Sequence, residues 1–215
     1  MSEDVSKESI SRLRIFNASR KLFARLGYER TTVSLICKEA GVNRAMVSYY
    51  YGGKLALYSE IMEMACNTLL RSLREGVYNE KGPTQRLRAF VKINIEFQII
   101  EPEETDMILR EVSSNFADMG DIIEKHFIQM LAVLADVIQE GKDSGVFEES
   151  MPSTEISFFV LGAINSFFVL YRLMRQTDFS LKIDRENKDV LVDNLHNLIM
   201  KGISKKKVSS NSPSD

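Results

Sequence analysis

Residues 32–57 read TVSLICKEAGVNRAMVSYYYGGKLAL, and this stretch decides how the rest of the chain is interpreted. Apolar residues recur at helical spacing on both sides of a tight turn at Ala40-Gly41-Val42, which predicts two short helices sharing one buried face. Gly41 can adopt the left-handed backbone that such a turn needs, and Asn43 is a good N-cap for the second helix. This pattern is typical of a helix-turn-helix, whose second helix enters the major groove of DNA.

The residues before and after this stretch strengthen the interpretation. The run IFNASRKLFARLGYERTTV precedes it at residues 15–33, and the aromatic-rich second helix is followed by Lys54, which opens a long helix. In combination these features, which span about a fifth of the chain, resemble the DNA-binding domain of the TetR family of bacterial transcriptional regulators. The resemblance implies an all-α protein with an N-terminal three-helix DNA-binding domain and a larger C-terminal helical domain for ligand binding and dimerisation.

The second helix of the motif, residues 44–51, is expected to read the DNA. Arg44 has the reach and the planar fork for a guanine edge, and Ala45 is small enough to approach a thymine methyl group. The resemblance implies that Tyr49 and Lys54 contact backbone phosphates. The predicted DNA-binding residues are Thr32, Ser34, Arg44, Ala45, Ser48, Tyr49 and Lys54.

Some positions depart from the pattern of the family. Leu35 occupies the place of the acid that completes a capping box, which leaves Thr32 or Ser34 free to contact a phosphate. Ser48 and Met46 stand where Tyr and Thr are common, Tyr51 replaces a core Phe, and Gly52-Gly53 replaces a more polar link. The fold should tolerate these changes, but the operator sequence cannot be taken from a relative.

Composition favours a helical protein without a membrane segment. The chain has 215 residues, 44% of them hydrophobic, and only four Pro, and its long 3.6-residue periodicities indicate helices throughout. No apolar run reaches the roughly 18 residues that span a bilayer, and the N-terminus lacks the apolar core of a secretion signal. Cys37 and Cys66 match neither a disulfide framework nor a metal site, so we expect small buried side chains in the reducing cytoplasm.

Charge is distributed unevenly along the chain. Residues 1–54 contain ten Lys and Arg and five Asp and Glu, whereas the remainder contains eighteen and twenty-five. The N-terminal quarter therefore carries a net +5 and the rest a net −7, which suggests that a polyanion binds at the N-terminal end.

About nine helices are expected in all. Besides the two of the motif, they are placed at about 9–26, 54–75, 84–100, 103–115, 118–144, 153–176 and 185–203. The turn-rich segment 76–83 ends the fourth helix, and this helix joins the two domains without a flexible linker. The predicted division is a DNA-binding domain at 1–54, a ligand-binding and dimerisation domain at 55–203, and a disordered tail at 204–215.

The helix at 153–176 is apolar nearly all round, so it needs partners on several sides. The resemblance implies that the last two helices pair with their copies in a four-helix dimer interface. An interior position in a single chain is the alternative. A two-fold dimer would present two reading helices to one face of the DNA.

The C-terminal domain is rich in aromatic and Met residues, which suit a small apolar or aromatic ligand, although most must belong to the core. His126 and Asn165 are polar residues at positions that could face inward, and a surface or hydrogen-bonded core position is the alternative for His126. The predicted ligand-lining residues are Phe97, Met107, Phe116, His126, Phe127, Met130, Asn165 and Phe168.

The leading hypothesis is a homodimeric repressor that binds double-stranded operator DNA and is released when the C-terminal domain takes up its effector. A DNA-binding regulator that needs no small ligand, whether constitutive, activating or controlled by a protein partner, is the alternative. A small helical enzyme is a remote third possibility, because His126 and His196 are far apart and the sequence has no nucleophile elbow, phosphate-binding Gly loop or metal pair. No cofactor and no metal are therefore expected.

Overall fold

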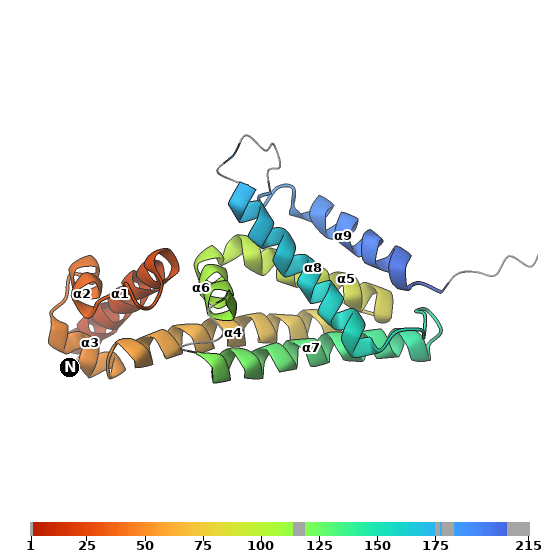
Figure 1. The fold of residues 1–215 in the computed structure, drawn as a ribbon. Coiled ribbons are helices and arrows are strands. Elements are labelled where there is room, and N and C mark those ends of the chain that lie inside the picture. The colour runs from red at the N-terminus through yellow and green to blue at the C-terminus, as the bar shows by residue number, and fades with distance from the viewer. Residues whose placement is uncertain (1, 114–118, 175–176, 178–182, 206–215) are drawn as a thin grey trace, which may run out of the picture. The chain divides into compact units, whose positions relative to one another are not determined.

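The computed structural model describes residues 2–113, 119–174, 177 and 183–205 (Figure 1). Its helices are α1 (Ser2–Leu26), α2 (Val33–Ala40), α3 (Arg44–Tyr51), α4 (Lys54–Tyr78), α5 (Pro83–Ile100), α6 (Pro102–Ser113), α7 (Gly120–Asp143), α8 (Ser153–Met174) and α9 (Lys188–Ile203). Within these residues there is no strand, only an isolated antiparallel bridge between Phe147 and Ser204. The predicted all-α class is confirmed.

Two helix ends differ from the sequence-based expectation. α1 begins at Ser2, seven residues before the expected start at Ser9. α4 continues to Tyr78, through Gly76, where a break was expected. Gly76 lies so close to the Cδ1 atom of Ile93 that a Cβ would overlap it. This glycine therefore allows α4 and α5 to approach each other rather than ending a helix.

The chain forms two compact units, and the predicted functional division at residue 54 stays a prediction beside them. Unit 1 comprises residues 1–71 and 100–128, and unit 2 comprises residues 72–99 and 129–215. α4 and α7 each contribute one end to each unit, and α6 belongs to unit 1 together with the helix-turn-helix.

One hydrophobic core holds unit 1 together. α1 supplies Ile15, Leu22 and Phe23 to it, because these positions share one face of the helix. Met107 of α6 is almost fully buried in the same core, where α6 packs against α1. The other buried members are Phe16, Ala18, Ala24, Ile36, Ala40, Val47, Tyr51, Leu57, Tyr58, Ile61, Met62, Met119 and Ile123.

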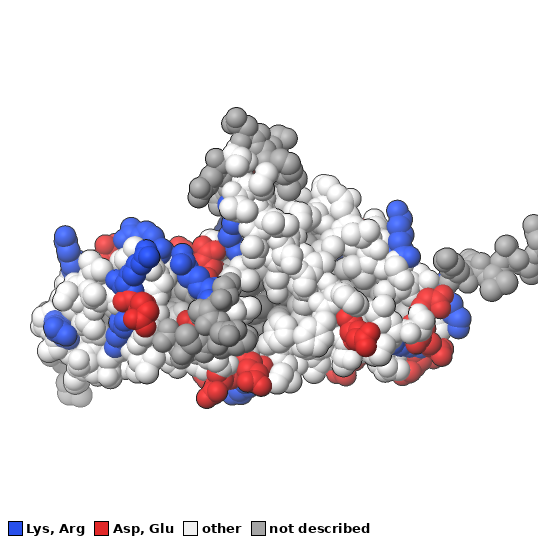
Figure 2. Space-filling view, viewed as in Figure 1, with Lys and Arg blue, Asp and Glu red and all other residues white. Residues whose placement is uncertain are grey.

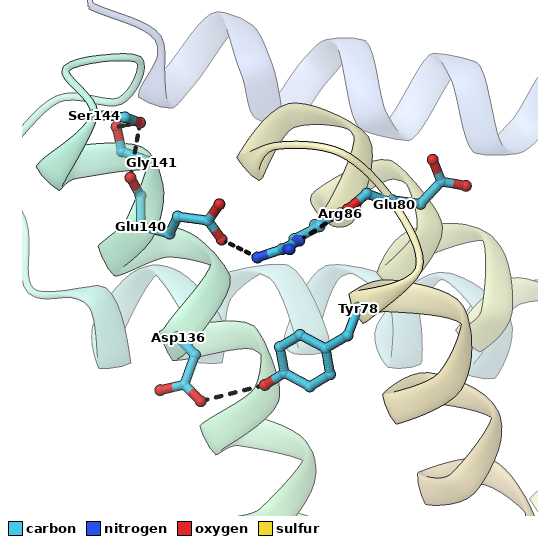
Figure 3. A network of polar contacts seen from close by, with 7 residues as sticks. All are labelled: Tyr78, Glu80, Arg86, Asp136, Glu140, Gly141 and Ser144. Atoms are coloured by element: carbon cyan, nitrogen blue, oxygen red, sulfur yellow. Dashed lines mark hydrogen bonds and ion pairs between the residues drawn. The ribbon is translucent and has the colours of Figure 1, made fainter.

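Polar contacts connect the helices of unit 2. Arg86 near the start of α5 lies 2.5 Å from Glu140 of α7, and the hydroxyl of Tyr78 donates to Asp136 at 3.3 Å (Figure 3). Burial is the main cause that raises the pKa of Tyr78. On α9, Lys188 pairs with Glu96 of α5. Unit 2 also contains buried apolar residues, which are Leu73, Val77, Leu87, Phe90, Val91, Ile95, Val133, Leu134, Val137, Ile138, Phe147, Ile156, Val160, Leu161, Ile164, Phe168 and Val192.

The turn after α7 is fastened to the end of α9. The amides of Val146 and Phe147 both donate to the carbonyl of Gly141, at 2.8 and 2.9 Å. Beyond it, the amide of Glu148 donates to Ile203, and the amide of Lys205 donates back to Val146. The first residues of the expected disordered tail are thus hydrogen-bonded, and residues 206–215 lie outside the described part of the chain.

The Gly141→Ala substitution is expected to lower the free energy of unfolding by about 2–3 kcal/mol, because it overpacks a filled core. A Cβ at residue 141 would overlap the fully buried ring of Phe147, whose Cγ would lie 2.7 Å away, and the hydrogen bonds to Gly141 keep the ring in place. Urea titration measures the effect. Gly202→Ala is the control, because no described residue lies within 4 Å of the position of its Cβ and alanine favours the helix. Equal stability of the two variants would contradict the prediction.

The helix α8 corrects one expectation from the sequence. It contains an 18-residue window with a mean hydropathy of 1.7, long and apolar enough to cross a membrane by length and composition. Ser, Gly and Asn residues interrupt the apolar run of α8, yet the mean hydropathy of the window stays high enough for a helix that could cross a membrane. About one third of this window is buried in the protein, so much of an apolar helix remains exposed.

Candidate DNA-binding site

Two side-chain caps fix the geometry of the helix-turn-helix. The Oγ1 atom of Thr32 accepts from the amide of Leu35 at 3.2 Å, and Oδ1 of Asn43 accepts from the amide of Met46 at 3.1 Å. Each cap satisfies an amide that the first turn of a helix leaves unpaired. Gly41 closes α2 with φ of 66°, in the left-handed region that glycine adopts without strain. The predicted cap and turn residues of the motif are confirmed.

The helix α3 buries one face and exposes the other. Val47 and Tyr51 are buried in the core of unit 1. The predicted reading residues Arg44, Ala45, Ser48 and Tyr49 are all exposed, and the side chain of Tyr49 is 75% exposed. Figure 2 shows that Lys and Arg side chains gather over the part of unit 1 built from α1 to α3. These four side chains are therefore accessible to another molecule, and their contact with a DNA groove stays a prediction.

Tyr51 holds the end of α3 against α1. Its hydroxyl donates to the backbone carbonyl of Arg12 at 2.8 Å, and the guanidinium of Arg12 lies 5.5 Å from the ring centroid. Burial is the main cause that raises the pKa of Tyr51, so its phenol remains a donor. Arg12 in turn pairs with Glu60 of α4 at 2.9 Å. A Phe at this position would lack the hydroxyl that bonds to Arg12. The hydroxyl of Tyr51 therefore helps to position the end of α3 against α1, and the apolar residues around Tyr51 in the sequence did not indicate this role.

The three predicted phosphate-contacting positions outside α3 lie at helix starts. Thr32 and Ser34 are exposed at the start of α2. Lys54 opens α4, where its ammonium donates to the carbonyl of Tyr28 at 3.0 Å and lies 3.8 Å from the ring centroid of Tyr28. An ammonium has three donors, so this single hydrogen bond leaves donors for a phosphate. The role of these three residues in DNA binding stays a prediction.

Acidic residues connect α6 to the DNA-binding helices, which sequence reasoning missed. Glu104 accepts from Arg20 of α1 at 2.7 Å, and Glu101 lies 3.8 Å from the same guanidinium. Burial, more than the neighbouring charge of Glu104, raises the pKa of Glu101. The two oxygens of Glu111 accept from the hydroxyl of Tyr58 and from the amide of Met119. The signal in the sequence was a cluster of Glu around Pro102, which resembles an ordinary acidic helix start.

The predicted ligand-lining residues fall into different parts of the chain. Phe97, Met130, Asn165 and Phe168 lie in unit 2, whereas Met107, His126 and Phe127 lie in unit 1, and Phe116 lies outside the described residues. The two ring nitrogens of His126 are hydrogen-bonded to Ile122 O at 2.7 Å and Asn67 Oδ1 at 2.9 Å. His126 is thus a buried histidine with both nitrogens engaged, and the ligand role of the whole set stays a prediction.

Other chemistry has little support in the described residues. They contain no cluster of three His, Cys, Asp or Glu side chains that could hold a metal ion. His126 and His196 lie in different units. Burial lowers the pKa of His196, and it raises the pKa of Cys66 to about 12, which keeps that thiol protonated and unreactive. Cys37 is only half-buried.

Comparison with known proteins agrees with the motif and extends beyond it. The profile of bacterial regulatory proteins of the tetR family matches residues 15–61, and that of the tetracyclin repressor-like C-terminal domain matches residues 80–173. The uncharacterized HTH-type transcriptional regulator YhgD of Bacillus subtilis is 26% identical over 152 residues, covering 68% of this chain and 76% of the relative. The HTH-type transcriptional repressor SCO4008 of Streptomyces coelicolor is 23% identical over 168 residues, covering 77% and 82%.

Solved structures show the same fold. The transcriptional regulator FadR from Bacillus subtilis, in complex with stearoyl-CoA, matches with a TM-score of 0.74 at 17% identity, covering 88% of this chain and 98% of FadR. The two profiles together account for the helix-turn-helix and for most of the helical body that follows it. The chain therefore belongs to the TetR family of bacterial transcriptional regulators, which are DNA-binding proteins and not enzymes.

Proposed function

We propose that this regulator is a homodimeric repressor that binds an operator through α3 and is released by a small apolar or aromatic effector. The exposed face of α3 carries the DNA-binding part of the proposal, because its four predicted reading residues point away from the core that buries Val47 and Tyr51. The relative from Streptomyces coelicolor, which is named a repressor, supports the direction of regulation. Such a protein acts in the cytoplasm, where its operator is.

The exposed apolar residues of α8 and α9 support the dimer. On α8, Phe159 is 66% and Leu173 is 68% exposed, and on α9, Leu198 is 68% exposed. Figure 2 shows few charged side chains over α8. The opposite face of α8 already packs in unit 2, where Ile164 and Phe168 are buried. Several large apolar side chains exposed on two helices are typical of an interaction surface, and a second copy of the same two helices would cover them.

The effector proposal is supported by a polar chain inside unit 2. Arg172 of α8 donates to Oε1 of Gln98 at 3.0 Å, and Nε2 of Gln98 donates to Oδ1 of Asn165 at 3.2 Å. Phe168 lies between the two α8 members of the chain in sequence, and aromatic and polar groups together are typical of a ligand site. FadR, which shares the fold, was solved with stearoyl-CoA. Native mass spectrometry of the purified protein would detect an effector carried through purification.

The Arg44→Ala substitution tests the reading helix. We take a duplex that the wild-type protein selects from a random library. The Arg44→Ala variant should bind this duplex about 1–3 kcal/mol more weakly than the wild type, because a bidentate base contact is removed. The affinity for a mixed-sequence duplex of equal length should change much less. The ratio of the affinity for the selected duplex to the affinity for the mixed-sequence duplex should therefore decrease. Titration of both duplexes by fluorescence anisotropy measures the two affinities.

Arg71→Ala is the matched control for that measurement, because Arg71 is an exposed arginine of unit 1 on α4, far along the chain from α3. It should leave the preference unchanged. If Arg44→Ala weakens both duplexes equally, Arg44 contacts a phosphate and not a base. If it weakens neither, α3 is not the reading helix.

A further inference from the structure

Four of the cations on α1 fall into two groups. Arg12 and Arg20 are paired with the carboxylates of Glu60 and Glu104. Arg14 and Lys21 are exposed, and no carboxylate among the side chains that the structure describes pairs with either of them. Arg12 and Arg20 already have carboxylate partners within the protein, so Arg14 and Lys21 are more readily available to another molecule.

Arg14 and Lys21 line a hollow between α1 and the end of α2. They are seven residues apart, so they lie on the same face of α1, about 10 Å apart along its axis. Lys38 of α2 is a third exposed cation at the hollow, whose volume is about 440 Å³. Ala18, Ala40 and Gly41 also line it, and their small size keeps it open between the three cations.

The charge of the hollow favours an anion. Glu39 is the acidic residue among those that line it, so three positive charges face one negative charge. A Lys in the last turn of α2 also interacts favourably with the helix dipole, which explains Lys38 in part. The dipole does not explain Arg14 and Lys21, which both lie before the last turn of α1.

The hollow is connected to the reading helix through the turn of the motif. Gly41 lines the hollow, and Arg44 at the start of α3 follows three residues later. We propose that Arg14, Lys21 and Lys38 bind backbone phosphates of duplex DNA next to the base pairs that α3 reads. The inference rests on the proposed operator binding and adds a phosphate-binding surface outside the seven predicted DNA-binding residues. An acidic protein surface would be the competing occupant, and it would leave DNA affinity unchanged.

The Arg14→Gln/Lys21→Gln variant tests the proposal in the full-length protein. Affinity is measured at a series of salt concentrations, with the selected duplex and with the mixed-sequence duplex. A plot of the logarithm of the association constant against the logarithm of the salt concentration has a negative slope. The magnitude of this slope should decrease by about 2 in the variant, because two phosphate contacts are lost and each contact releases about one counterion. Affinity should drop roughly tenfold for both duplexes alike, since phosphates carry no sequence information.

Two further variants make the outcome decisive. Arg71→Gln/Lys125→Gln removes two exposed cations of unit 1 outside the hollow and should leave the slope unchanged. Arg14→Lys/Lys21→Arg keeps the charges and should keep the slope. The proposal is overturned if Arg14→Gln/Lys21→Gln has the same salt slope and DNA affinity as Arg71→Gln/Lys125→Gln. It is also overturned if Arg14→Lys/Lys21→Arg loses as much DNA affinity as Arg14→Gln/Lys21→Gln. If the wild-type protein selects no duplex, the proposed function is contradicted as well. If it selects a duplex but the Arg14→Gln/Lys21→Gln variant has the same salt slope as the wild type, only phosphate binding at the hollow is contradicted.

Discussion

The Phe159→Glu variant should be a monomer, with a dimer dissociation constant raised at least about 1,000-fold, or roughly 4 kcal/mol. Phe159 is among the most exposed of the apolar residues on α8. Burial of a Phe side chain contributes about 1.5–3 kcal/mol, and a two-fold interface contains the residue twice. The substitution also places two carboxylates in an apolar interface, which adds a desolvation cost. Sedimentation equilibrium gives the constant directly.

The same variant should bind the selected duplex far more weakly than the wild type, since a monomer presents only one copy of α3. Ile128→Glu is the matched control, because Ile128 is 55% exposed on α7 and lies outside α8 and α9. It should remain a dimer and keep its DNA affinity. A dimeric Phe159→Glu protein with the constant of the wild type would show that α8 is not the interface.

The Glu104→Ala variant should lose about 3 kcal/mol of unfolding free energy. The side chain of Glu104 is 5% exposed and that of Arg20 is 26% exposed, so the pair is largely removed from water. Removing the carboxylate leaves the guanidinium partly buried, and Glu101 at 3.8 Å is then its one carboxylate partner among the described side chains. The loss should fall short of the upper end for buried pairs, because Glu101 compensates in part. Urea titration measures it, and hydrogen exchange should show faster exchange of the α6 amides.

Two comparisons separate this effect from the loss of any surface charge. Glu60→Ala removes the Arg12 pair, whose side chains are 54% and 44% exposed, and should cost less than about 1 kcal/mol. Arg20→Met/Glu104→Met should recover most of the stability, because two apolar side chains leave no buried charge. If Glu60→Ala and Glu104→Ala lowered the unfolding free energy by equal amounts, the expected effect of burying the Arg20–Glu104 pair would be contradicted.

Helix boundaries could be predicted where local chemistry sets them. Thr32, Asn43 and Gly41 act within three or four residues of their own position, and the ends predicted for α3 match the structure. Gly76 and Gly141 could not be understood in this way. Each meets a side chain from a later segment, Ile93 and Phe147, and a sequence does not show which distant side chain approaches a glycine.

The exposure of Arg44, Ala45, Ser48 and Tyr49 on α3 could be predicted for the same local reason, because the side chains around a short helix have fixed directions once one face is buried. The contacts of α6 were not. Glu104 and Arg20 are 84 residues apart, and both residue types are ordinary on a helix surface. The ligand-lining residues were chosen by chemical type over several helices, and this criterion cannot tell which residues share one compact unit.

The anchoring of α9 at both ends bears on how two copies would meet. Lys188 is paired with Glu96 at one end, and the bridge between Ser204 and Phe147 holds the other. The helix therefore has its backbone fixed within the isolated chain, and association would not have to fold it. Coupled folding typically consumes several kcal/mol of the gross interaction energy, and a preformed helix avoids that loss. The heat-capacity change of pairing should accordingly scale with the apolar area of α8 and α9 alone, without a contribution from newly formed helix.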